Sequence, residues 1–405
     1  MSKPILTIFY QFNPWCSSIG GIQTFIYSFL KYAPSEFDVR LVGIGEPRSP
    51  SGVWQEAEFA GRSIQFMPLI SLPNNDNVRS LIPTTIKYTA ALVGRNFASD
   101  FMHFHRLEPT IATLKWSGEK TLFIHNDIRK QMDPTTSKNA ILWRRFPAGY
   151  FALERFLIKQ FSQIYSCNTE ATEFYQHRYP ALAERTTYLK NTVDNEIFYP
   201  LNPEEWEEKR RAFAQQRSLP EQTRFVLFAG RLHPQKDPIL LIRSFAALNE
   251  PNVHLLIAGD GELASEVHSE IHRYGLSEQV TMLGPVVQEK LAELHRISSV
   301  FVLSSAYEGL PLVVLEALAS GTPVVTTRCG ETPRLLTSGS GMVCKERTSV
   351  AIADALRQVL RHPEDYPATS CTRAAEPYTA RTVVGEVYQK MLQRWKLMRF
   401  LVYRA

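Results

Sequence analysis

The stretch "SSAYEGLPLVVLEALASGTPVV" (Ser304–Val325) holds two glutamates, Glu308 and Glu316, with seven residues between them. A Gly-Leu-Pro break follows Glu308, and a Gly-Thr-Pro break follows the apolar run that contains Glu316. Proline suits the first helical position because its missing N–H would have no partner there, so the stretch predicts a helix from Pro311. Eight residues of helix rise about 12 Å and turn through roughly 80°. We therefore expect Glu308 in the loop before the helix and Glu316 inside it.

The start of this predicted helix offers backbone donors. The amides of Leu310, Leu312 and Val313 would be among the N–H groups without an acceptor in the helix, and such ends bind anions. Two carboxylates beside these donors favour a ligand that is both polyhydroxylated and phosphorylated. The alternative is that Glu308 caps the helix and Glu316 is a solvated helix residue, since acidic helix starts are common.

The size and composition of the chain restrict its class. A chain of 405 residues exceeds one typical core and indicates two domains, and 44% hydrophobic with 21% charged residues is globular. The net charge of +5 fits an anionic small ligand or an anionic surface better than nucleic acid. The five scattered cysteines form no metal motif and predict a reducing compartment. With no signal-like start and no apolar run of spanning length, we expect a cytoplasmic protein, peripheral at most at the inner face of the plasma membrane.

Short apolar runs alternate with helical runs along the chain, which is typical of βαβ units and buried parallel sheets. The runs fall at 5–10, 37–44, 64–70, 100–105, 121–126 and 163–168, and then at 225–230, 253–259, 280–284, 300–305, 323–327 and 341–344. The polar, proline-spaced segment 191–222 between them reads as a linker leading into a second domain. The predicted fold class is α/β, with two Rossmann-like, doubly wound domains facing an interdomain cleft where ligands bind by default.

Polar groups follow several strands of the first half. Gly20 and Gly21 precede a helical run, so their backbone could approach a phosphate, although a simple tight turn is an equal alternative. The triplet His125-Asn126-Asp127 follows another strand, where a lone histidine is more often structural than catalytic.

Two further histidines, His103 and His105, alternate on "FMHFHR" and share one face of a strand. A histidine pair can bind metal, but no nearby carboxylate completes a site, so core packing is the favoured interpretation.

In the second half, "FAGRLHPQKD" places Arg231 and Lys236 near a helix start, with Gly230 in the turn. An arginine fork and a mobile lysine charge both suit phosphate oxygens. The "IAGDGEL" turn lacks the full dinucleotide fingerprint, so NAD binding is poorly supported. The "MLGPVV" turn at Gly284 exposes backbone that could read a flat base edge.

Taken in order, the Gly-Gly turn, the strand-end histidine, "GRLHPQK", "GDGE", "LGPV" and "EGLPLVVLEALASGTPVV" resemble the retaining GT-B glycosyltransferases of family 4, the group 1 glycosyltransferases. The resemblance covers nearly the whole chain and is strongest over 225–327. It implies an N-terminal acceptor domain at 1–195, a C-terminal nucleotide-sugar domain at 196–381, and a final helix at about 382–405 that packs back on the first domain.

The resemblance also implies roles for the quoted residues. Glu308 would bind hydroxyls of the donor sugar, Glu316 would bind the ribose, and Arg231 with Lys236 would stabilise the departing diphosphate. His125 would lie beside the anomeric carbon. The remaining donor-binding residues would be Gly20, Gly21, Gly230, Gly284, Val286, Gly309, Leu310, Leu312 and Val313.

The resemblance further implies a retaining hexosyltransferase that requires no metal and no other cofactor beyond its nucleotide-sugar substrate. No DxD triplet occurs in the chain, and two cations take the place of a metal. UDP-glucose is the favoured donor, with GDP-mannose and UDP-GlcNAc as alternatives. Two competing functions are a nucleotide-sugar epimerase or hydrolase of the same fold and a non-catalytic nucleotide-sugar-binding subunit.

The prediction of the acceptor side depends on residues 128–160. This segment carries seven Lys/Arg, two acidic residues and several interleaved aromatics. Such a segment suits an anionic bilayer or a polyprenyl-linked sugar, although a helix packed on the sheet with a solvated basic face is an equal alternative. We expect Asn126, Asp127, Arg144 and Arg145 on this side, and a saccharide or lipid-linked oligosaccharide acceptor used in exopolysaccharide or envelope polysaccharide synthesis.

Overall fold

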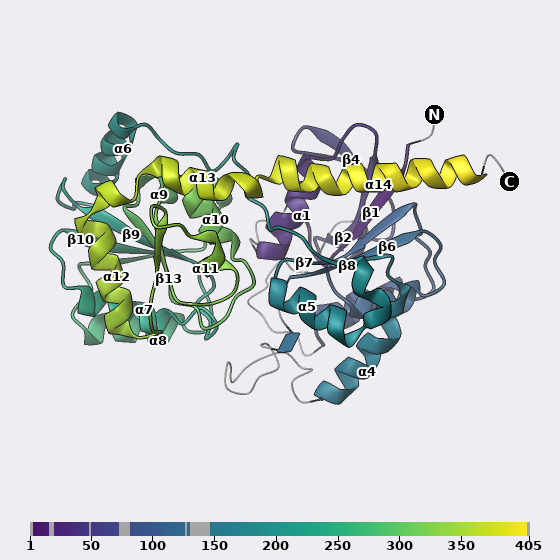
Figure 1. Ribbon diagram of the computed structural model, residues 1–405, viewed down its shortest axis with the longest axis horizontal. Coiled ribbons are helices and arrows are strands. Elements are labelled where there is room, and N and C mark those ends of the chain that lie inside the picture. Colours follow the sequence, from purple (N-terminus) through teal and green to yellow (C-terminus); the bar gives the residue numbers. More distant parts are fainter. Residues whose placement is uncertain are drawn as a thin grey trace. The chain divides into compact units, whose positions relative to one another are not determined.

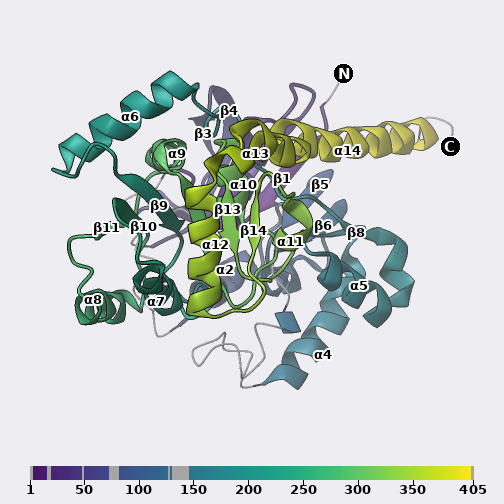
Figure 2. The same ribbon diagram turned by 60° about the vertical axis from the view of Figure 1, so that its left-hand side comes forward.

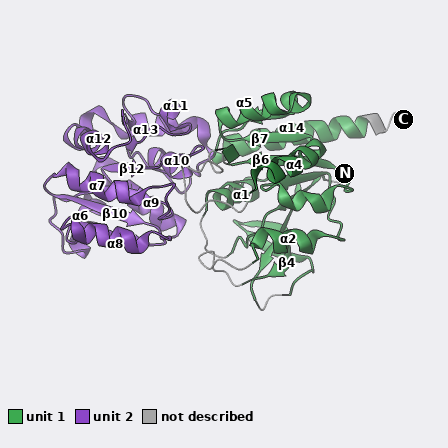
Figure 3. Cartoon of the chain, turned by 90° about the horizontal axis from the view of Figure 1, so that it is seen from below, with its two compact units in different colours: residues 1–132, 140–191, 380–405 green, residues 133–139, 192–379 purple. Residues whose placement is uncertain are grey.

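The structure is a computed structural model that describes residues 3–15, 20–47, 50–72, 82–125, 128–129 and 146–402. The chain divides into two compact units, coloured separately in Figure 3. Among the described residues, unit 1 contains those up to 129, 146–191 and those from 380 onwards, and unit 2 contains 192–379. Both units are α/β and are built on largely parallel sheets (Figure 1).

The sheet of unit 1 has the strand order β3-β4-β2-β1-β5-β6-β7-β8. Its strands are β1 (Ile5–Phe9), β2 (Asp38–Gly45), β3 (Gln55–Phe59), β4 (Arg62–Ser71), β5 (Phe101–Phe104), β6 (Glu119–Ile124), β7 (Gln163–Ser166) and β8 (Thr186–Tyr188). Its α-helices are α1 (Gly21–Lys31), α2 (Thr84–Leu92), α4 (Pro147–Leu157), α5 (Thr169–Arg178) and α14 (Ala380–Val402), with 3-10 turns η1 (Glu108–Thr113), η3 (Ile158–Gln160) and η4 (Pro180–Arg185).

Strands β3 and β8 lie outside the predicted apolar runs. Strand β3 pairs antiparallel with β4 and alternates between half-buried and exposed residues, so it lacks the continuous apolar pattern that marks a buried strand. Ala60 and Gly61 join the two strands with φ of 49° and 74°, the left-handed pair that a two-residue hairpin turn requires. An Ala-Gly pair between short polar strands is a weak sequence signal, so this antiparallel edge strand is not among the predicted apolar runs.

The two faces of the unit 1 sheet carry separate cores. Leu6 and Ile8 face α1 and α14, whereas Phe9 faces the side that α2 and α4 cover. The last helix, α14, is therefore part of unit 1: Tyr388 is buried against Phe29 and donates a hydrogen bond to its carbonyl oxygen at 2.9 Å. Figure 1 shows α14 in yellow running alongside α1 and β1.

The sheet of unit 2 is fully parallel, with the order β11-β10-β9-β12-β13-β14. Its strands are β9 (Arg224–Ala229), β10 (Val253–Ala258), β11 (Val280–Gly284), β12 (Val300–Leu303), β13 (Val324–Thr326) and β14 (Gly341–Val343). Its helices are α6 (Pro203–Gln216), α7 (Pro238–Leu248), α8 (Ala264–Arg273), α9 (Gln288–Ile297), α10 (Leu312–Ala319), α11 (Thr332–Leu335), α12 (Ser349–Arg361) and α13 (Ala368–Ala375), with 3-10 turns η5 (Pro363–Asp365) and η6 (Glu376–Tyr378).

This sheet is buried on both sides, which explains its continuous apolar strands. Val226 and Phe228 face α7, α8 and α12, whereas Phe225 and Leu227 face α6, α9 and α10. Helices α7 and α12 pack side by side on the first of these faces (Figure 2).

The segment predicted as a linker is partly helical. Within 191–222, residues Pro203–Gln216 form α6, which begins with a capping box between Asn202 and Glu205. Phe213 and Ala214 then anchor this otherwise polar helix in the core of unit 2. None of the helices within the described residues is both long and apolar enough to span a membrane.

Candidate active site

The loops of unit 2 that carry the predicted residues Arg231, Lys236 and Glu308 lie at one place in the sheet. The strand order reverses between β9 and β12, which are neighbours in space although 70 residues separate the end of the first from the start of the second. In doubly wound sheets, ligands bind beyond the carboxyl ends of the strands at such a switch point. The loop after β9 carries Arg231 and Lys236, and the loop after β12 carries Glu308.

A buried ion pair joins these two loops. Lys236 Nζ donates to Glu308 Oε1 at 2.6 Å, and the Glu308 side chain is only 7% exposed. Ser305 Oγ donates to the same carboxylate oxygen at 2.7 Å. The opposing Lys236 charge and the Ser305 hydroxyl therefore hold the carboxylate in one orientation, at the point where the sheet predicts a ligand.

Further hydrogen bonds hold the same two loops together. Ser304 Oγ donates to the carbonyl oxygens of Lys236 and Asp237 at 2.8 and 3.0 Å. The Gln235 side-chain amide donates to the carbonyl oxygen of Tyr307 at 3.0 Å. Asp237 itself has φ of 47°, caps α7 through the Leu240 amide and forms an ion pair with Arg347. Sequence reasoning gave no role to Gln235 or Ser304, although both lie within the quoted stretches.

Gly330 is a further residue that sequence reasoning missed. Its φ is +58°, and a Cβ atom built there would lie 2.0 Å from the Gly309 carbonyl oxygen and 2.7 Å from that of Glu308. The amide of the next residue, Glu331, donates to the same Gly309 oxygen at 2.9 Å. Gly330 thus allows the loop after β13 to press directly against the Glu308–Gly309 backbone.

We expect Gly330→Ala to destabilise unit 2 by clearly more than the about 1–2 kcal/mol that a left-handed non-glycine residue costs. The reason is that the added methyl group must also displace the backbone after Glu308. The matched control is Gly275→Ala, where φ is +67° but the methyl group would meet nothing within 4 Å. Urea unfolding of both variants measures the difference, and equal losses would show that the close approach at Gly330 is unimportant.

Glu316 is buried in the middle of α10, with 5% of its surface exposed. Burial raises the pKa of its carboxyl to about 8, and the nearby Lys236 charge lowers it by a smaller amount. Its Oε2 atom is buried and accepts no hydrogen bond from any described residue. The alternative that Glu316 is a solvated helix residue is therefore wrong, and its buried oxygen is free to accept a hydrogen bond.

The start of α10 differs slightly from the prediction. Pro311 is the N-cap and the helix begins at Leu312. The Glu308 carboxylate accepts hydrogen bonds from Gln235, Lys236 and Ser305 instead, so among the described residues it does not cap this helix, contrary to the alternative interpretation. The amides of Leu312 and Val313 fall in the first turn and have no acceptor within the helix. Gly309 and Leu310 are buried beside them.

The other predicted residues of unit 2 lie around this centre. Arg231 is exposed, and its side chain has no hydrogen bond or ion pair with any residue that the structure describes. Gly230 borders Lys236, whose side-chain carbons would lie 3.5–3.7 Å from a Cβ at that position. Gly284 ends β11 with φ of 67°, and its carbonyl oxygen accepts from the Gly259 amide at 2.8 Å. Val286, two residues further on, packs against the core of unit 2.

In unit 1, His125 follows β6 and is half-buried. One of its ring nitrogens, Nε2, lies 2.9 Å from Nδ1 of His105, so one ring donates and the other accepts. Burial and the Arg106 charge lower the pKa of His125 to about 3, and burial with the neighbouring histidines lowers that of His105. Both rings are therefore neutral at physiological pH. The His125 carbonyl oxygen accepts from the Cys167 thiol at 3.1 Å.

The remaining predicted residues of unit 1 have varied positions. Gly20 is the N-cap of α1 and Gly21 its first residue, so the glycine pair does begin a helix. His103 is fully buried against Phe29 and Phe123, as core packing predicts. The acceptor-side predictions Asn126, Asp127, Arg144 and Arg145 lie outside the described residues. No cluster of three His, Cys, Asp or Glu side chains suited to a metal occurs in the part of the chain that the structure describes.

Solved structures share this fold over nearly its whole length. Sucrose-phosphate synthase from Thermosynechococcus elongatus superposes with a TM-score of 0.73 at 19% identity, covering 100% of both chains. HepE of Anabaena in complex with UDP-glucose gives a TM-score of 0.70 at 18% identity, covering 97% of this chain and 99% of HepE. WaaG, a glycosyltransferase involved in lipopolysaccharide biosynthesis, gives 0.69 at 18% identity, covering 96% of this chain and 99% of WaaG. The fold is thus that of the two-domain GT-B glycosyltransferases.

Sequence comparison assigns the family. The model for "Glycosyl transferases group 1" matches residues 209–375. EpsF, a candidate glycosyltransferase of Bacillus subtilis, is 30% identical over 316 residues, which cover 76% of this chain and 75% of EpsF. D-inositol 3-phosphate glycosyltransferase of Corynebacterium glutamicum is 30% identical over 214 residues, and the match spans 50% of each chain. This chain belongs to the group 1 glycosyltransferases, as its motifs predicted.

Proposed function

We propose that this protein transfers a hexose from a nucleotide-sugar to a saccharide or lipid-linked saccharide, with retention of configuration at the anomeric carbon. UDP-glucose is the first candidate donor. The observation that carries the proposal is the group formed by Lys236, Glu308 and Glu316 at the switch point of unit 2. It provides a cation, a carboxylate held in one orientation and a buried carboxyl with an unpaired oxygen.

Each of these groups suits one part of a nucleotide-sugar. Glu316 would accept hydrogen bonds from the ribose hydroxyls through its unpaired oxygen, and Glu308 would accept them from the sugar. Lys236 and Arg231 would stabilise the negative charge that gathers on the diphosphate as it leaves, and the amides of Leu312 and Val313 would add donors. Gly284 and Val286 would contact the base.

Within this proposal no metal is required, because the two cations would stabilise the charge that a divalent ion neutralises in other sugar transferases. The leaving phosphate would assist deprotonation of the acceptor hydroxyl. From unit 1, Gly20 and Gly21 would bind phosphate through their backbone, and His125 would contribute its ring or carbonyl near the anomeric carbon. The neutral state of the His125 ring is compatible with a hydrogen-bonding role.

The descriptions of several related structures support the proposed donor and context. The HepE structures are described as complexes with UDP-glucose, with UDP and glucose, and with UDP. WaaG is described as a glycosyltransferase involved in lipopolysaccharide biosynthesis, which supports a place in envelope polysaccharide assembly for this chain. Because the match spans about half the length of several curated relatives, donor and acceptor remain part of the proposal.

A thermal-shift series without added metal tests the donor. A ligand at 100 times its Kd stabilises the native state by about 2.7 kcal/mol, so UDP should raise Tm and UDP-glucose should raise it further. We expect smaller shifts with GDP, ADP and their sugar conjugates. Glu316→Gln is the matched variant, because it should keep the fold and reduce the shift with UDP. No shift with any nucleotide near millimolar concentration would contradict the proposed site, and a selective shift with GDP would reassign the donor.

Product analysis tests the reaction class separately. With donor and a glycan acceptor present, we expect a new glycosidic bond with the anomeric configuration of the donor. Formation of an epimer, or rapid release of free sugar when no acceptor is present, would instead indicate the epimerase or hydrolase alternative.

A further inference from the structure

The GDGE turn, residues 259–262, has no part in the proposed mechanism, although it lies beside the proposed donor site. It follows β10 and pairs with the start of the loop after β9. The amide of Leu232 donates to the Asp260 carbonyl oxygen at 2.9 Å, and the amide of Leu263 donates to the Leu232 carbonyl oxygen at 3.0 Å. The two loops are therefore joined through their main chains.

Two glycines of the GDGE turn allow this close approach. A Cβ atom at Gly259 would lie 2.0 Å from the Gly230 carbonyl oxygen, and one at Gly261 would lie 2.5 Å from that of Leu232. A side chain at either position would push the GDGE turn away from the loop after β9. The contact between the two loops thus explains why this motif contains glycine.

Side chains extend the contact towards the proposed donor site. Glu262 Oε1 lies 3.5 Å from Nε2 of His233, which belongs to the loop after β9. The other ring nitrogen of His233, Nδ1, accepts a hydrogen bond from the Gln235 amide at 3.2 Å. A nitrogen that accepts from an amide carries no hydrogen, so the ring hydrogen is on Nε2 and faces Glu262. A single histidine therefore contacts both loops.

His233 also begins the turn that leads to Lys236. The Lys236 amide donates to the His233 carbonyl oxygen at 2.9 Å, which closes a four-residue turn with Pro234 in its second position. Proline suits that position because its φ is already fixed. A first residue whose side chain accepts from the amide two residues further on, as His233 does from Gln235, is typical of such turns. His233 thus fixes the backbone that carries the Lys236 side chain.

Gln235 completes the connection to Glu308. Its side-chain amide donates to the Tyr307 carbonyl oxygen at 3.0 Å and to Glu308 Oε2 at 3.4 Å. Its main-chain carbonyl oxygen accepts from the Ala306 amide at 2.8 Å. A continuous series of contacts therefore joins the GDGE turn to the Glu308 carboxylate.

We propose that His233 and Glu262 are positioning residues for the transfer reaction, which hold Lys236 and Glu308 where the diphosphate and the sugar of the donor bind. The inference rests on the proposed function, which it deepens by giving the GDGE turn a role. Neither residue has to touch the donor. A displacement of about 1 Å at a catalytic group can cost on the order of 100-fold in rate, so a small movement of the loop after β9 has a large effect.

Steady-state kinetics of His233→Ala test this assignment. We expect kcat/KM for the donor to fall by about 10–100-fold, because the loop of Lys236 loses the acceptor that fixes its turn. His233→Asn should restore most of the loss, since its Oδ1 atom can accept from the Gln235 amide in the same way. His362→Ala is the matched control: it removes a histidine that lies 3.4 Å from Glu364 at the surface, and should leave turnover unchanged. Native turnover in folded His233→Ala would overturn the proposal.

Variants of Glu262 test the other end of the contact. Glu262→Ala should lower kcat/KM by less than His233→Ala does, because the hydrogen bond from the Gln235 amide is kept. Glu262→Gln should recover most of this loss, since its amide oxygen can still accept from the Nε2 hydrogen. Native activity in Glu262→Ala would contradict the inference, because the GDGE turn would then have no influence on the reaction.

A double-mutant cycle with Lys236→Ala distinguishes positioning from a general loss of structure. If His233 acts through Lys236, adding His233→Ala to Lys236→Ala should lower kcat/KM little further. Losses that multiply in full would refute the positioning role, because a structural defect lowers the activity of either protein by the same factor. Urea unfolding shows that each variant is folded. Should His233→Ala fail to fold, the same cycle with Glu262→Ala gives the decision.

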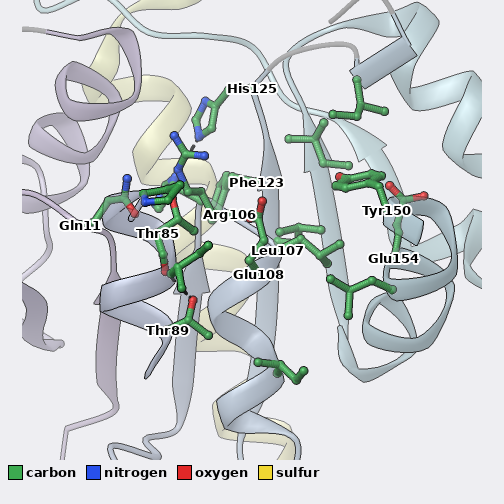
Figure 4. Close-up of a pocket in the computed structure, with 18 of the residues that line it drawn as sticks. Gln11, Thr85, Thr89, Arg106, Leu107, Glu108, Phe123, His125, Tyr150 and Glu154 are labelled. Carbon is green, nitrogen blue, oxygen red and sulfur yellow. Dashed lines mark hydrogen bonds between the residues drawn. The ribbon is translucent and has the colours of Figure 1, made fainter. Parts of the chain in front are cut away.

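The acceptor should bind to these variants as it binds to the native protein. The proposed acceptor side of unit 1 includes a pocket of about 820 Å³ that His125 helps to line (Figure 4). His233, Gln235 and Glu262 do not line this pocket. We therefore expect the acceptor KM of His233→Ala to be unchanged while kcat falls. A raised acceptor KM with native kcat would contradict the assignment.

The thermal shift with UDP separates this inference from the proposed function. If UDP stabilises the native chain and the chain transfers sugar, but His233→Ala and Glu262→Ala are as active, the positioning role is wrong and the proposed function stands. If the native chain shows neither a UDP shift nor transfer, the proposed function is wrong and this inference fails with it.

Discussion

Replacing Lys236 by alanine is expected to lower kcat/KM for sugar transfer by about 10²–10³-fold, the usual loss when one preorganised charge stabiliser is removed. Lys236 is the cation in direct contact with Glu308, at 2.6 Å, in the loops that form the switch point of unit 2. Without it, the charge on the leaving diphosphate would be met by Arg231 and backbone amides alone. Initial rates of transfer with saturating acceptor measure the effect.

Stability must be separated from catalysis in this variant. Removing Lys236 leaves the buried Glu308 carboxylate without its partner, which should destabilise the protein by at most about 3–5 kcal/mol, the loss measured for fully buried pairs, because Lys236 is partly exposed. The double variant Lys236→Met with Glu308→Gln removes both charges, so it should recover much of that stability while remaining inactive. Lys290→Ala, which breaks an exposed pair with Glu293, should change neither property. Retained turnover in folded Lys236→Ala would refute the assigned site.

Replacing Glu316 by glutamine is expected to stabilise the protein above neutral pH. Its pKa is raised from 4.5 to about 8 in the folded state by burial, so the native state binds the extra proton between these values. Stability is therefore greatest below about pH 4.5 with respect to this group and falls as pH rises towards 8. One pKa unit corresponds to about 1.4 kcal/mol, so the full difference is on the order of 5 kcal/mol above pH 8.

Denaturant unfolding of native protein and Glu316→Gln between pH 5 and 9 measures this difference. The curves should coincide near pH 5 and diverge as pH rises, with the variant more stable. Glu270→Gln is the control of opposite sign. The hydrogen bond from Arg243 lowers the pKa of Glu270, so replacing this carboxylate should destabilise the protein at neutral pH. Parallel curves for native protein and Glu316→Gln would show that Glu316 is not a buried carboxyl.

The same carboxyl connects stability to ligand binding. Residues with strongly shifted pKa values that lower the stability of the ligand-free protein are typical of functional sites, where a ligand supplies the missing interactions. Ribose hydroxyls that donate to Glu316 would favour its charged form and release a proton on binding. The stabilising effect of glutamine and the loss of the UDP thermal shift should therefore appear in the same variant.

Much of the architecture could be predicted because local patterns determine it. The twelve predicted apolar runs correspond to β1, β2, β4, β5, β6 and β7 and to all of β9 to β14, since a strand buried on both faces needs a continuous apolar sequence. The Gly-Leu-Pro break predicted the loop before α10 to within one residue. Edge strand β3 was not predicted, because its residues are polar and half-exposed and therefore form no apolar run in the sequence.

The sequence by itself determined which residues follow each strand, and hence that Lys236 and Glu308 stand at strand ends. Only the tertiary structure determines their contact at 2.6 Å. The contact requires β9 and β12 to be neighbours in the sheet, although β10 and β11 lie between them in the sequence. The burial of Glu316 depends likewise on helices packed around α10, which no local pattern reveals. The close approach of Gly330 to the Gly309 carbonyl oxygen likewise depends on the tertiary structure. Residue type and local order are properties of the chain, whereas burial and long-range contacts depend on the order in which strands pair.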